Sequence, residues 1–114
     1  MPQQALLELE TALGAETARN MAAIFAEEWR RQCAVIASPE LPPDGAVRDA
    51  KRRAAHDLVT NAGSMGFNEL SIAARRLEQA ILKGDPLETS TAAAPIPALA
   101  DAALAQLADR YGSL

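Results

Sequence analysis

The chain has 114 residues, of which 49% are hydrophobic and only 4% aromatic, and its formal net charge is −4. This length suits one domain, residues 1–114, with a single core and no disulfides. An acidic chain lacks the basic surface that general nucleic-acid binding needs, so we exclude nucleic acid as a partner.

Hydrophobic residues recur at steps of three and four along most of the chain, which indicates amphipathic helices. We predict helices over Gln3–Leu13, Ala15–Ala37, Ala46 to the Gly63–Gly66 segment, Asn68–Lys83 and Ala98–Tyr111. Gly14, the proline-rich run 38–45 and Gly84-Asp85-Pro86 are helix breakers, and Leu87–Pro97 is predicted to be a loop. The fold class is therefore all-α, an antiparallel four-helix bundle with a short extra N-terminal helix.

The third helix has two distinct sides. Its predicted core line comprises Val47, Ala50, Ala54, Leu58, Ala62 and Met65, and its solvent line comprises Asp49, Arg52, His56, Thr60 and Gly63. Asp44 is the expected N-cap, and Lys51-Arg52-Arg53 is expected to be a solvated basic run. His56, the only histidine, is thus predicted to point into water on a rigid helix.

Most enzymatic motifs are missing from the sequence. One histidine and one cysteine exclude the usual zinc sets, and there is no Gly-x-x-x-x-Gly-Lys loop for ATP. Cys33 follows the buried line of its helix, which argues against a Cys33–His56 nucleophilic pair. A single cysteine fits a reducing compartment. Without an apolar run of membrane-spanning length or a secretory signal, we expect a cytoplasmic protein with no membrane partner.

The run Ala55-His56-Asp57-Leu58-Val59-Thr60-Asn61-Ala62-Gly63-Ser64-Met65-Gly66 resembles the signature of histidine-containing phosphotransfer (HPt) domains. His56, Leu58, Gly63 and Gly66 match by type and spacing, and the flanking helices are similar as well. The resemblance implies that His56 accepts a phosphoryl group from a receiver-domain aspartyl phosphate and passes it to another receiver. The implied partners are response-regulator receivers and hybrid histidine kinases. The chain would then be a monomeric carrier that needs no cofactor of its own, because the receiver brings Mg²⁺.

Two positions depart from the family signature, which has lysine where this chain has Val59 and glycine where it has Thr60. Arg52, one turn before His56, and Arg53 on its flank are candidate substitutes that support the phosphate. The Thr60 hydroxyl is a further candidate for binding phosphate, and Gly63 is expected to keep the docking surface open.

Other interpretations of the same residues remain open. The chain could be a non-transferring docking module that binds and regulates a kinase or response regulator, with His56 incidental. A third interpretation is that the chain is a helical bundle that self-associates through its apolar faces. The basic run could simply be solvated, and Gly63 and Gly66 could serve helix packing or a helix end.

Overall fold

The computed structural model describes residues 2–112, in which there are six helices and no strand. The all-α prediction is confirmed. The helices are α1 (Pro2–Leu13), α2 (Ala15–Ala37), α3 (Gly45–Ser64), α4 (Asn68–Lys83), α5 (Pro86–Ala93) and α6 (Ile96–Tyr111).

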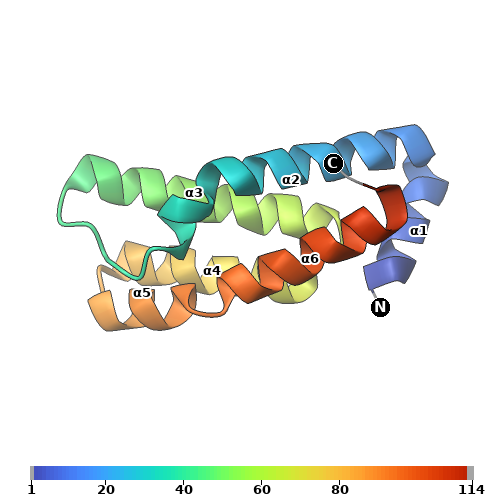
Figure 1. Cartoon of the computed structure of the whole chain (residues 1–114). Coiled ribbons are helices and arrows are strands. Elements are labelled where there is room, and N and C mark those ends of the chain that lie inside the picture. Colours follow the sequence, from blue (N-terminus) through green and yellow to red (C-terminus); the bar gives the residue numbers. More distant parts are fainter. Residues whose placement is uncertain (1, 113–114) are drawn as a thin grey trace.

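Four of these helices surround the core. α3 packs between α2 and α4, and α6 packs against both α2 and α4, so that the four form a closed ring. Figure 1 shows these four lying along one another, with successive helices running in opposite directions. α1 packs against α2 at one end, and α5 packs on α4. The helix that carries His56 is therefore held from both sides.

The interior is built mainly of small and aliphatic side chains. The buried residues of α3 include Ala54, Ala55, Leu58 and Ala62, and those of α4 include Leu70, Ala73, Ala74 and Leu77. Alanines let the two helix backbones approach closely. Phe25 of α2 and Phe67 of the α3–α4 turn add a tilted ring contact, with centroids 5.5 Å apart. Close packing fixes α3 and α4 relative to one another.

The prediction of a loop over Leu87–Pro97 is wrong, because α5 occupies most of that segment. Pro86 lies in the first turn, where its missing N–H costs nothing. The Asp85 carboxylate caps the helix by accepting from the Glu88 N–H at 3.0 Å. The buried Thr89 hydroxyl donates to the Asp85 carbonyl at 2.7 Å. Threonine and proline made this helix look irregular in the sequence.

The first turns of α3 also differ from the prediction. Val47 is 54% exposed and Ala50 is exposed, whereas Lys51 is only 1% exposed. The Lys51 ammonium donates to the Ser38 carbonyl and, at 2.7 Å, to the Glu40 carbonyl. It thereby satisfies backbone groups at the end of α2 and in the loop that follows. Burial lowers the pKa of Lys51.

The predicted helix boundaries around α3 and α4 are otherwise confirmed. Asp44 caps α3, because its Oδ1 accepts from the N–H groups of Ala46 (2.9 Å) and Val47 (3.1 Å). Gly84 ends α4 in the left-handed conformation, with φ 70°. Across the described residues, no helix combines the length and hydropathy needed to cross a membrane.

Candidate functional site

His56 projects outward from the middle of α3, and its side chain is 58% exposed. The helix beneath it is anchored by Ala55 and Leu58, which are 0% and 5% exposed. The ring is thus presented to solvent by a helix that is itself part of the core, as the helical spacing predicts.

The His56 ring has one partner from the neighbouring helix. Its Nδ1 lies 2.9 Å from Oε2 of Glu78 on α4. The Glu78 side chain is only 16% exposed, so the carboxylate lies deeper than the ring. Because a carboxylate only accepts hydrogen bonds, Nδ1 is the donor, and in the neutral ring Nε2 keeps its lone pair. The contact therefore orients the ring and selects its tautomer.

Glu78 is the site residue that the sequence analysis missed. Residues 56 and 78 are equally distant in sequence from Phe67, in the turn that joins α3 to α4. In an antiparallel helix pair, residues equidistant from the turn come level with each other. That symmetry was present in the sequence and could have identified Glu78.

Arg52 also lies next to Glu78, but its guanidinium already forms an ion pair with Asp49. Its guanidinium donates to Asp49 Oδ1 through Nε at 3.1 Å and Nη2 at 3.0 Å. Its Nη1 lies 3.8 Å from Glu78 Oε2. Arg53, on the flank of α3, has its Nε 3.2 Å from Asp49 Oδ2. Arg52 and His56 thus converge on Glu78, and Asp49 holds both arginines.

The structure separates the three remaining predicted site residues. Val59 is partly buried and packs against the core, and its carbonyl accepts from the Ser71 hydroxyl at 2.8 Å. Gly63 is exposed, and a Cβ added there would lie 3.4 Å from Ser71 Oγ. Thr60 is exposed, one turn after His56. Val59 therefore serves the α3–α4 contact, whereas Thr60 and Gly63 lie on the open side of α3.

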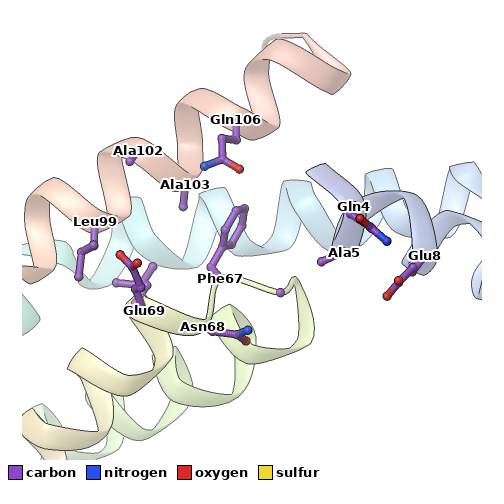
Figure 2. A pocket seen from close by; sticks show the side chains of 12 residues that line it. Gln4, Ala5, Glu8, Phe67, Asn68, Glu69, Leu99, Ala102, Ala103 and Gln106 are labelled. Carbon is purple, nitrogen blue, oxygen red and sulfur yellow. The ribbon is translucent and has the colours of Figure 1, made fainter. Parts of the chain in front are cut away.

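His56 lies on an open surface and not in a pocket. A pocket of about 590 Å³ lies between α1, the α3–α4 turn and α6, and His56 is not among its lining residues. Figure 2 shows Phe67 and Gln106 in this pocket. In the part of the chain that the structure describes, no group of three or more His, Cys, Asp or Glu residues could hold a metal ion. An imidazole on an open helix surface suits approach by another protein.

The comparisons with known proteins give one match. The family model of the Hpt domain matches residues 3–110, nearly the whole chain. No curated protein and no solved structure matches significantly.

Proposed function

Because the chain belongs to the Hpt domain family, whose members transfer phosphoryl groups in two-component phosphorelays, we propose that His56 is its phosphoryl acceptor. The donor is the aspartyl phosphate of a receiver domain, and a second receiver takes the group onward. The contact between His56 Nδ1 and Glu78 is the observation that carries this proposal. It leaves Nε2 as the nucleophile on an exposed ring.

The chemistry follows from the tautomer. The Nε2 lone pair attacks phosphorus in line with the aspartyl oxygen. The N–P bond forms as the P–O bond breaks, and the aspartate leaves as a carboxylate with the electron pair. The proton stays on Nδ1, so the ring becomes cationic and the Glu78 carboxylate offsets that charge. Such a reaction depends on positioning and charge neutralisation, and the receiver supplies the divalent cation that the aspartyl phosphate needs.

The neighbouring exposed residues fit contact with the receiver. Arg53, Thr60 and Gly63 lie around His56 on the solvent side of α3. Arg52 takes a different part, because its guanidinium lies 3.8 Å from the same Glu78 oxygen that contacts the ring. We therefore assign Arg53, Thr60 and Gly63 to docking and Arg52 to holding the carboxylate.

The direct test is transfer of labelled phosphate from a phosphorylated receiver domain to the wild-type protein and to His56→Gln. Phosphoramidate, a small donor that needs no docking, is used in parallel. We expect the wild type to gain one acid-labile, alkali-stable phosphoryl group from either donor, and His56→Gln to gain none. Equal labelling of the two proteins would refute the assignment of His56.

A non-transferring docking module remains the second candidate, favoured by Val59 and Thr60 at positions where the family has lysine and glycine. The same variants separate the two functions. If His56→Gln keeps both receiver binding and full output in cells, while Arg53→Glu abolishes binding, the docking function is correct and the transfer function is not.

A further inference from the structure

We propose that Arg75, on the outer side of α4, is the cation that binds the phosphoryl group carried by His56. This proposal rests on the proposed function and identifies a residue that the family signature does not contain. Three observations support it: the balance of charge around the ring, the small number of basic side chains without an acidic or carbonyl partner, and the position of Arg75 on its helix.

The groups next to His56 leave no surplus positive charge for an incoming phosphoryl group. A phosphorylated side chain carries about two negative charges near neutral pH. Arg52 and Arg53 are both held by Asp49, and Arg52 also lies 3.8 Å from Glu78. Two arginines are thus matched by two carboxylates, and the cationic ring that the transfer creates leaves only one positive charge against the two negative charges of the phosphoryl group. A further cation is needed to stabilise a dianion there.

In the part of the chain that the structure describes, few basic side chains lack a carboxylate or carbonyl partner. Of the eleven lysines and arginines, seven donate a hydrogen bond to a carboxylate or a carbonyl, and Arg53 forms an ion pair with Asp49. Within residues 2–112, the structure records no such partner for Arg30, Arg75 and Arg76, and all three are exposed.

The position of Arg75 on α4 distinguishes it from the other two. Ser71 and Glu78 of α4 both contact the outer edge of α3, at the Val59 carbonyl and the His56 ring. Arg75 lies four residues after Ser71 and three before Glu78, within about 60° of both around the helix. Residues at these spacings have Cβ atoms about 5–6 Å apart. An arginine side chain at this position can extend to a phosphoryl group on the ring.

The other two uncommitted arginines face elsewhere. Arg76 is a further 100° or so around α4 and lines the groove between α4 and α5, together with Lys83 and Leu87. Arg30 is on α2, where Glu28 lines the contact with α3 together with Asp57. Arg30 is two residues from Glu28, which places it about 200° around the helix, away from α3. Arg76→Gln is therefore a matched control for Arg75→Gln, since it removes the same charge from the same helix.

The experiment compares wild type, Arg75→Gln, Arg75→Lys and Arg76→Gln with phosphoramidate as donor. In this reaction the donor P–N bond breaks, ammonia leaves after taking up a proton, and the Nε2–P bond forms. We expect Arg75→Gln to slow phosphorylation about three- to tenfold at low salt, with a smaller effect at high salt. Arg75→Lys is expected to recover much of the rate, and Arg76→Gln to match the wild type.

A second readout separates phosphate binding from a structural effect. The pH dependence of the phosphohistidine ³¹P NMR shift reports the loss of the ring proton on Nδ1, which a nearby cation favours. We expect Arg75→Gln to move that midpoint upward by about 0.3–0.5 pH unit and Arg76→Gln to leave it unchanged.

The outcomes are distinct. Equal behaviour of Arg75→Gln and wild type, or equal losses in Arg75→Gln and Arg76→Gln, would overturn the role of Arg75. A wild-type protein that neither donor phosphorylates would instead refute the proposed function, and the role of Arg75 would fall with it.

Discussion

At the scale of single residues, the site depends on one carboxylate shared by an arginine and a histidine. Glu78 accepts from the His56 ring and lies beside Arg52, while its own side chain is 16% exposed. A carboxylate oxygen close to two partners has few alternative positions. The orientation of the imidazole therefore follows from α4 as much as from the helix that carries it.

Replacing Glu78 tests this dependence. We expect Glu78→Ala to slow phosphorylation of His56 about tenfold or more, because the ring loses both its orientation and the charge that offsets the imidazolium. Glu78→Gln retains an acceptor oxygen but not the charge, so its rate should lie between those of Glu78→Ala and wild type. Single-turnover labelling by phosphoramidate measures these rates, with circular dichroism as the check on folding. Unchanged rates in both variants would show that Glu78 has no part in the reaction.

At the scale of elements, the turn between α3 and α4 sets which residues of the two helices meet. Gly66 has φ +83°, and a Cβ added there would lie 2.3 Å from the Cβ of Ala5. Only glycine satisfies both the backbone conformation and the close approach of α1. Because His56 and Glu78 lie on opposite sides of this turn, its geometry controls the register of the site.

Gly66→Ala is expected to destabilise the fold by about 2–4 kcal/mol, from the strain of positive φ and the clash with α1. Adding Ala5→Gly removes the clash but not the strain, so the double variant should be more stable than the sum of the single effects predicts. Gly63→Ala is the control and should stay within about 0.5 kcal/mol of wild type, because its nearest contact is the side chain of Ser71. Urea unfolding measures all of these free energies. Additive effects of Gly66→Ala and Ala5→Gly would contradict the proposed clash.

The elements also show what the sequence could and could not reveal. Apolar spacing predicted α2 and α4, and cap residues such as Asp44 and Gly84 marked helix ends, because these signals are local. α5 was missed because its first turn contains Pro86 and its sequence lacks a clear apolar stripe. The burial of Lys51 depends on where the preceding loop folds, and the role of Glu78 depends on how two helices pair. Both are tertiary effects that spacing within one helix does not encode.

At the scale of the whole molecule, the first and last helices are joined by one polar cluster. The Glu10 carboxylate of α1 accepts from Arg110 Nη2 at 2.8 Å and from the Tyr111 hydroxyl at 2.6 Å. Arg19 of α2 adds a hydrogen bond to the Tyr111 carbonyl at 3.1 Å. The cluster connects α1, α2 and α6 at the end of the bundle where α1 lies and α6 ends (Figure 1).

This cluster makes stability dependent on pH in the acid range. Hydrogen bonds from Arg110, and then from Tyr111, lower the pKa of Glu10 from 4.5 to about 2. Since the folded-state pKa is depressed, the contribution is fully present above about pH 4.5 and is lost as the pH falls toward 2. We expect Glu10→Gln to have a lower urea midpoint than wild type at pH 6, with the difference shrinking between pH 4.5 and pH 2. A difference that is constant with pH would contradict this assignment.

The burial of Lys51 has a practical consequence for chemical labelling. The chain has two lysines, and the side chain of the other, Lys83, is 66% exposed. An acylating reagent should therefore modify Lys83 in the native protein and reach Lys51 only when the bundle opens. Peptide mass mapping after brief acetylation, with and without urea, would measure this difference. Slow modification of Lys51 under native conditions would then report how often the end of α2 separates from α3. A fluorophore could also be attached at Lys83 without altering the face of the protein that carries the imidazole.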